Sequence, residues 1–146
     1  MIVLDANILI RAVLGRKVRE LLERYSQSGI RFLAPDSAFA EAHKHLPALL
    51  RRVGRPTEDA DSSLDFLRGV VESIDREFYA SHEQEARERL RGRDEDDWPV
   101  LAAALAMSCP IWTEDTDFFG TGHSVWTTRN IEIFLKSKTS AIEPEE

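Results

Sequence analysis

The sequence lacks the segments and residues on which several classes of protein depend. It has one cysteine in 146 residues, so no internal disulfide can form. No apolar run approaches the roughly 20 residues that a membrane-spanning helix needs. No basic segment with a following apolar stretch opens the chain, so we expect no signal peptide. Together these absences favour a reduced, cytoplasmic protein that does not enter a membrane.

Motifs of several catalytic and metal-binding classes are missing as well. His43 and His45 are two residues apart, which does not place both on one helix face, and no cysteine pair has a zinc-binding spacing. The chain contains neither a glycine-rich phosphate loop nor a GxSxG nucleophile motif. Cys109 precedes a proline at the start of an apolar run, where we expect it to pack in the core. Any chemistry must therefore come from other side chains.

The balance of charge argues against nonspecific coating of nucleic acid. Acidic residues outnumber Lys and Arg by 26 to 19, which gives a net charge of −7. Proteins that bind nucleic acid through backbone charge alone are usually basic. Two interpretations of the acidic surplus remain open: a solvated surface, or several acids that converge on divalent cations.

Short apolar runs alternate with helical patterns along the chain. The expected strands are residues 1–4, 30–34, 70–74, 109–113 and 124–127, and helical patterns lie between them. Pro47 is expected to kink or interrupt the helix that begins near Asp36. The alternation predicts an α/β fold, a three-layer α/β/α domain over residues 1–135 with a mostly parallel sheet of about five strands. Residues 136–146 are predicted to form a disordered acidic tail.

Acidic residues stand where such a sheet would gather its chemistry. Asp5 follows the first expected strand and Asp115 the fourth, and the carboxyl ends of parallel strands meet at one edge of a sheet. Asp97 opens an apolar helix that can reach the same edge. Taken alone, each of these residues is more typical of a turn or a helix cap. Converging carboxylates repel one another, and Mg²⁺ or Mn²⁺ would relieve that repulsion through oxygen ligands.

Three segments resemble the PIN-domain nucleases, and in particular the VapC-like toxins. The opening MIVLDANILI is similar to the first strand and Asp-x-Asn turn of that family. Residues 97–105, DWPVLAAAL, and 110–118, PIWTEDTDF, resemble its Ala-rich helix and the strand that ends in Thr-x-Asp-x-Asp-Phe. Glu41 matches the helical glutamate of the family. The resemblance covers roughly residues 1–135 and implies a PIN-like domain.

The resemblance also implies a set of site residues. They are the metal ligands Asp5, Asp97 and Asp115, then Glu41, which ligates a metal or orients the attacking water, and the supporting residues Asn7, Thr113 and Asp117. In this interpretation the first four residues are catalytic, and Asp117 is a further acid at the edge of the site. Either Asp96 or Asp97 could face the site, and the spacing to Thr113 favours Asp97.

The activity implied by the resemblance is cleavage of RNA by a Mg²⁺- or Mn²⁺-dependent endoribonuclease. A toxin of a type II toxin–antitoxin pair would also have a small antitoxin as partner and would often form a homodimer. An arginine or lysine inserted by the antitoxin could replace the charge of the metal.

The sequence leaves two alternatives to the ribonuclease: a phosphatase and a non-catalytic binding protein. Phosphatases of the haloacid-dehalogenase kind carry Asp-x-Asp after their first strand, but this chain has Asn7 at the second position and no well-placed lysine later on. A non-catalytic PIN-like scaffold that binds RNA or a protein is the more serious alternative. Such scaffolds usually lack one or more of the acids, whereas every expected position is occupied here. Metal binding that is lost in Asp5→Asn would favour the enzyme.

Overall fold

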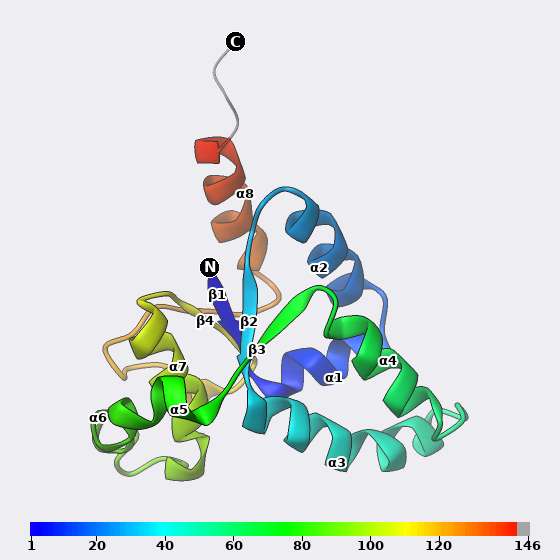
Figure 1. Cartoon of the computed structure of the whole chain (residues 1–146), viewed down its shortest axis with the longest axis horizontal. Coiled ribbons are helices and arrows are strands. Elements are labelled where there is room, and N and C mark those ends of the chain that lie inside the picture. Colours follow the sequence, from blue (N-terminus) through cyan, green and yellow to red (C-terminus); the bar gives the residue numbers. More distant parts are fainter. Residues whose placement is uncertain (143–146) are drawn as a thin grey trace.

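The computed structural model describes residues 1–142, and these form a parallel sheet covered by helices on both faces (Figure 1). Within this part of the chain the sheet has five strands in the order β3-β2-β1-β4-β5, and every neighbouring pair is parallel. The strands are β1 (Ile2–Leu4), β2 (Phe32–Pro35), β3 (Val71–Ile74), β4 (Ile111–Trp112) and β5 (Val125–Trp126). The predicted number and direction of the strands are therefore confirmed.

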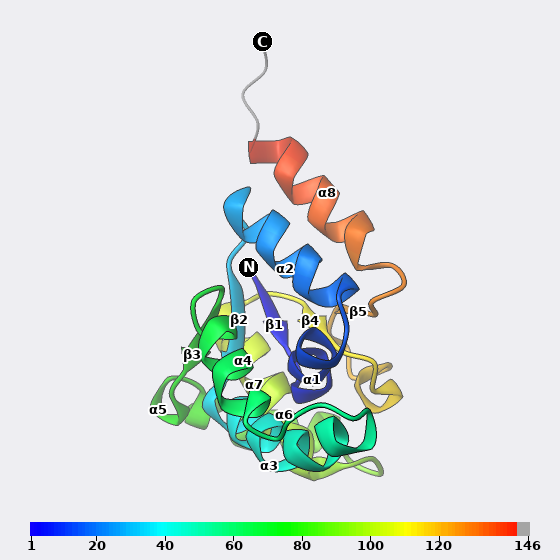
Figure 2. The same cartoon turned by 90° about the vertical axis from the view of Figure 1, so that its right-hand side faces the viewer.

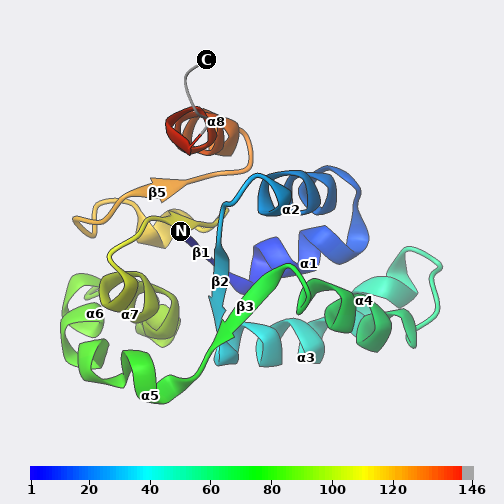
Figure 3. The same cartoon turned by 45° about the horizontal axis from the view of Figure 1, so that its top comes forward.

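Helices form the two outer layers, which Figure 3 shows on either side of the sheet. The α-helices are α1 (Ala6–Leu14), α2 (Lys17–Gln27), α3 (Asp36–Arg52), α4 (Asp59–Leu67), α5 (Arg76–Tyr79), α6 (Glu83–Arg89), α7 (Trp98–Met107) and α8 (Ile131–Ile142). Because side chains alternate across a strand, Ile2 and Leu4 pack with α1–α4 and α8, whereas Val3 packs with α5–α7. This confirms the three-layer α/β/α fold. No helix in the described part of the chain is long and apolar enough to cross a membrane.

The expected break at Pro47 is wrong, because α3 runs without interruption from Asp36 to Arg52. Proline removes one helical hydrogen bond, but the helix buries apolar residues on both sides of it. Leu46 and Leu50 are fully buried in the same core, so their packing keeps the helix continuous across the proline. The structure therefore has one long helix where the sequence suggested two.

Helix α8 also differs from its expected length, since it continues past Leu135 to Ile142. It lies beside α2 (Figure 2), where the Tyr25 hydroxyl donates to Glu132 over 3.0 Å. Ile131 and Leu135 anchor its first turns in the core, so the polar turns that follow extend an existing helix rather than nucleate a new one. The expected tail boundary at residue 136 thus falls inside a helix, and residues 143–146 lie outside the described residues.

Candidate active site

The site lies where the chain changes direction across the sheet. From β1 the chain adds β2 and β3 on one side, and it then returns to add β4 and β5 on the other. Asp5 directly follows β1, and Thr113 directly follows the neighbouring β4. In an open parallel sheet this switch point leaves a crevice at the carboxyl ends of the strands, which is the usual place for a ligand.

Asp5 is buried at the bottom of this crevice and is held by several donors. Its side chain is the N-cap of α1, because Oδ1 accepts from the Ala6 backbone N–H over 2.6 Å. Its Oδ2 accepts from the Thr113 hydroxyl at 2.8 Å and from the Asn7 amide at 3.1 Å. The Asn7 Oδ1 in turn accepts from the Glu114 backbone N–H at 3.2 Å. Two of the three expected supporting residues, Asn7 and Thr113, therefore join the ends of β1 and β4 around Asp5.

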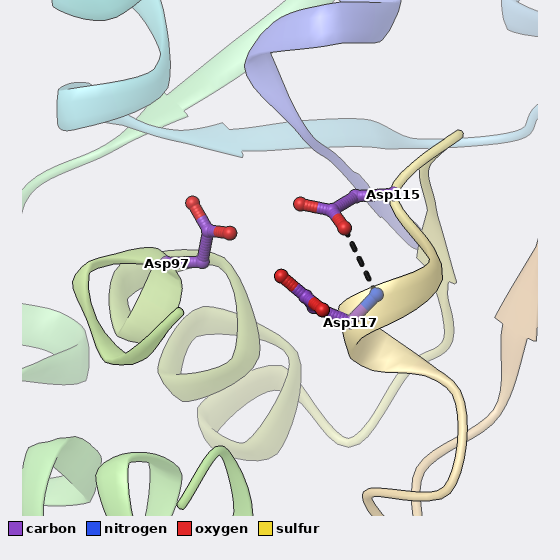
Figure 4. A group of neighbouring side chains, drawn as sticks. All are labelled: Asp97, Asp115 and Asp117. Carbon is purple, nitrogen blue, oxygen red and sulfur yellow. Dashed lines mark hydrogen bonds between the residues drawn. The ribbon is translucent and has the colours of Figure 1, made fainter. Parts of the chain in front are cut away.

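Three further carboxylates, those of Asp97, Asp115 and Asp117, converge on one another, as Figure 4 shows. One ligand oxygen each from Asp97, Asp115 and Asp117 lies within 4.8 Å of the others. The Asp115 carboxylate accepts from the Asp117 backbone N–H over 2.9 Å, and this bond caps a 3₁₀ turn over Thr116–Phe118. That turn swings Asp117 back toward Asp97.

The grouping differs from the expected ligand set in one member. The group contains two of the expected metal ligands, Asp97 and Asp115. Its third carboxylate is that of Asp117, which the family resemblance puts at the edge of the site. Asp5 is not one of the three, and both of its oxygens accept hydrogen bonds from neighbouring donors.

Asp97 is available to the cluster because its side chain does not cap a helix. It occupies the N-cap position of α7, yet its carboxylate makes no capping hydrogen bond. The 3₁₀ turn before it, Glu95–Asp97, is capped instead by Asp94, which accepts from the Asp96 backbone N–H over 3.1 Å. Asp96 is exposed at the mouth of the site. Of the two adjacent aspartates, Asp97 is thus the one that joins the carboxylate group.

Glu41 lies on an exposed turn of α3, which is a different element from those that carry the three aspartates. It lines a hollow of about 460 Å³ together with Asp97, and the side chains of Lys44 and His45 line the same hollow. These two residues stand three and four positions after Glu41, so one helix face carries all three. Sequence analysis missed this role for Lys44 and His45, although their spacing from Glu41 could have indicated it.

The electrostatics show that the site holds more negative charge than its surroundings stabilise. Burial raises the pKa of Asp5 from 3.8 to about 6; hydrogen bonds from Thr113 and Ala6 lower it, and the charges of Glu41 and Asp115 raise it further. The pKa of Asp97 rises to about 8, first through burial and then through repulsion from Asp5 and its contact with Asp115. Without a cation, the folded protein must bind protons here in order to limit repulsion.

The donor chemistry suits a hard divalent cation. All the converging ligand atoms are carboxylate oxygens, which Mg²⁺ and Mn²⁺ prefer, and no histidine or cysteine belongs to the group among the described residues. A bound cation would supply the positive charge that the raised pKa values show to be missing. The residues present therefore fit the metal that the sequence led us to expect.

Comparison with known proteins agrees with this architecture. The sequence matches the PIN domain family over residues 3–136. The fold resembles VapBC2 of Rickettsia felis bound to a promoter DNA fragment, with a TM-score of 0.65, 19% identity, and coverage of 87% of this chain and 98% of that one.

Two other solved structures are similar. A toxin–antitoxin complex from Klebsiella pneumoniae has a TM-score of 0.60 at 19% identity, covering 88% of this chain and 98% of that one. FitAB bound to a DNA fragment has a TM-score of 0.57 at 21% identity, covering 88% of this chain and 95% of that one. In the comparison with curated proteins, no sequence matches the chain. Since the family match spans most of the sequence and both the switch-point crevice and its acids are in place, the chain belongs to the PIN domain family.

Proposed function

We propose that the protein is a Mg²⁺- or Mn²⁺-dependent endoribonuclease that hydrolyses RNA phosphodiester bonds. The observation that carries the proposal is the convergence of Asp97, Asp115 and Asp117 near the buried Asp5. Such a group of oxygen donors is costly to a fold unless it holds a cation. RNA is proposed as the substrate because the site motifs resemble those of VapC-like toxins, and a protein without disulfides suits the cytoplasm.

Each part of the crevice has a distinct task in this proposal. Asp97, Asp115 and Asp117 would hold the ion, and Asp5 would complete its surroundings from below. When bound, the ion supplies Lewis acidity, which activates water and stabilises the negative charge that develops on the phosphodiester in the transition state.

The protein's own residues provide position and proton transfer. Glu41, on α3, orients the attacking water and accepts its proton, and Lys44 attracts the phosphate backbone into the hollow. Asn7 and Thr113 keep Asp5 fixed through their hydrogen bonds, so the bottom of the site does not rearrange when the substrate enters.

We further propose that the enzyme is the toxin of a type II toxin–antitoxin pair and forms a homodimer. The likeness in fold to VapBC2 and to a toxin–antitoxin complex supports the antitoxin partner, and the homodimer rests on the resemblance to VapC-like toxins alone. An antitoxin arginine or lysine placed among the carboxylates would neutralise them as a cation does. Co-expression with the neighbouring gene of the native operon, followed by size-exclusion chromatography with light scattering, tests both the partner and the dimer.

The activity is tested with purified protein free of any partner. Cellular RNA is incubated with Mg²⁺, with Mn²⁺ or with EDTA, beside Asp97→Asn and the control Asp65→Asn, an exposed carboxylate on α4. Discrete new RNA ends that require metal, persist in Asp65→Asn and vanish in Asp97→Asn are expected. Unchanged RNA in every lane from folded, metal-binding protein would favour the non-catalytic scaffold instead.

A further inference from the structure

A second hollow adjoins the carboxylate site and has no part in the chemistry described so far. It measures about 380 Å³ and lies where α3, α5 and α7 meet. Ala40 of α3 lines both hollows, and Trp98, which lines the second, directly follows Asp97 in the chain. An RNA strand whose phosphate lies at the carboxylates would therefore bring a neighbouring nucleotide to this second hollow.

Arg76 forms a flat platform on one wall of this hollow. Its guanidinium lies over the Trp98 ring, 5.0 Å from the centroid, and its Nη2 is 3.3 Å from one oxygen of Glu83. Arg87 also lies over this ring, 5.5 Å from the centroid, and pairs with the other Glu83 oxygen at 2.9 Å, so Glu83 ties the two guanidinium groups together. Trp98 is only 4% exposed, whereas the Arg76 side chain is 65% exposed. The guanidinium, rather than the indole, is thus open to a ligand.

Asp36 provides an oriented acceptor in the same hollow. Its Oδ1 accepts from the Tyr79 hydroxyl at 2.5 Å and from the Ser37 backbone N–H at 2.8 Å. Its Oδ2 accepts from the Arg76 backbone N–H at 3.1 Å. A carboxylate offers about four lone-pair positions, so these three donors fix the group and leave one position on Oδ2 for a further donor.

The pairing of these two groups suits a nucleobase better than a phosphate. The negative charge of Asp36 opposes the attraction of a phosphate to Arg76. An unpaired base, by contrast, stacks on a guanidinium plane and presents its edge for hydrogen bonding. Adenine, cytosine and guanine each carry an exocyclic amino group that can donate to a carboxylate, whereas uracil offers only its ring N3–H, which lies between two carbonyl oxygens that a carboxylate repels.

We propose that this hollow binds the nucleobase next to the scissile phosphate, stacks it on Arg76, and selects bases with an exocyclic amino group through Asp36. The inference rests on the proposed ribonuclease function for its position along the RNA. It adds a sequence preference to that function: uracil is disfavoured at one fixed position beside the cut.

The test measures binding and cleavage separately, on the whole protein. Fluorescence anisotropy in EDTA and low salt gives the affinity for labelled hexamers of adenosine, cytidine and uridine, so that no strand is cut. The same proteins are then given a mixed-sequence RNA with Mn²⁺, and the new ends are mapped. The variants are Arg76→Ala, Arg76→Lys, which keeps the charge but not the plane, and Asp36→Asn. The matched control is Arg19→Ala. Arg19 lies on α2, its guanidinium is 4.3 Å from the centroid of the Phe66 ring of α4, and it lines neither of the two hollows.

We expect the wild type to bind the adenosine and cytidine hexamers at least about fivefold more tightly than uridine. Loss of the stacking plane in Arg76→Ala and in Arg76→Lys should weaken adenosine and cytidine binding about tenfold. Asp36→Asn should abolish the difference between hexamers, and Arg19→Ala should behave as the wild type does. Thermal denaturation checks that each variant is folded. If Asp36→Asn does not fold, the binding data of the two Arg76 variants test the base site.

The outcomes separate this inference from the function on which it rests. Equal affinity of the wild type for all three hexamers, or unchanged binding in Arg76→Ala, overturns the base site even where RNA is cut. Amino-dependent binding without metal-dependent cleavage overturns the ribonuclease and leaves the base site standing. Absence of both binding and cleavage overturns the two proposals together.

Discussion

Replacement of Asp97 by asparagine should make the metal-free protein more stable, although it removes a proposed metal ligand. The pKa of Asp97 is raised from 3.8 to about 8, so the folded state binds this proton more tightly than the unfolded chain does. Stability of the metal-free protein therefore falls as the pH rises from 3.8 toward 8. Asparagine has nearly the same shape and does not titrate. Because the Asp97 carboxylate makes no capping bond, the substitution also removes no helix cap.

The size of the effect follows from the shift. A rise of about four pKa units corresponds to at most about 6 kcal/mol, at 1.36 kcal/mol per unit. Asp97 is only half-buried, and solvent screens its repulsion from neighbouring acids, so we expect a gain of about 1–2 kcal/mol at pH 8. At pH 5 the gain should be less than half of this, because the wild-type carboxyl is then protonated in the folded state.

Urea denaturation in EDTA at pH 5 and pH 8 measures the free energy of unfolding of both proteins. Asp65→Asn serves as the control, since it removes one exposed carboxylate elsewhere and should change little at either pH. If Asp97→Asn were no more stable than the wild type at pH 8, repulsion at the carboxylates would not be the cost that we infer. When the prediction holds, added Mn²⁺ should reverse the order of stability of the two proteins, because the ion stabilises only the protein that retains the Asp97 carboxylate.

Four further predictions concern the site and its supports. Thr113→Val should cost about 2–3 kcal/mol of unfolding free energy in urea, because the hydroxyl that donates to Asp5 is buried and valine has the same shape. Mn²⁺ at about 100 times its Kd should stabilise the wild type by about 2.7 kcal/mol in thermal shift, and EDTA should reverse this gain. Pro47→Ala should raise stability by about 1–2 kcal/mol, since it restores a helical N–H inside α3; a loss would show that the helix is built around the proline. Tyr79→Phe should cost about 1.5–3 kcal/mol through the lost hydrogen bond to Asp36. Burial raises the pKa of Tyr79 from 10.0 to about 12, so wild-type stability should fall across that pH range, and a phenylalanine variant should lack this loss.

Sequence reasoning located the bottom of the site because that part depends on a simple rule. Asp5 and Asp115 follow the ends of the parallel strands β1 and β4, and such strand ends meet at one edge of the sheet, whereas Thr113 was expected only from the family resemblance. The place of Asp117 in the carboxylate group depends on a 3₁₀ turn closed by its own backbone N–H, and no periodicity announces such a turn. Local rules also failed where tertiary packing opposed them, as at Pro47, where buried leucines on both sides keep the helix whole.

The second hollow could not be foreseen from sequence at all. Arg76 and Trp98 are more than twenty residues apart, and their stacking depends on how α5 and α7 pack on one face of the sheet. The composition of the chain shows many arginines and three tryptophans but not which of them meet. Strand ends predicted Asp5 and Asp115, the family resemblance added Glu41, Asn7 and Thr113, and neither pointed to Arg76 or Asp36.

The hydrogen bonds between the ends of β1 and β4 have a consequence for synthesis of the protein. Asp5 and Thr113 are separated by 108 positions, and Asn7 and Thr113 by 106. A ribosome that has made the first hundred residues has released Asp5 and Glu41 but neither Asp115 nor Asp117. The nascent chain therefore lacks its proposed catalytic centre until Asp115 and Asp117 have been made, and a product that ends before Asp115 never acquires one. For an enzyme that would attack RNA, this order of assembly keeps the messenger and the ribosome that produce it out of reach of the unfinished chain.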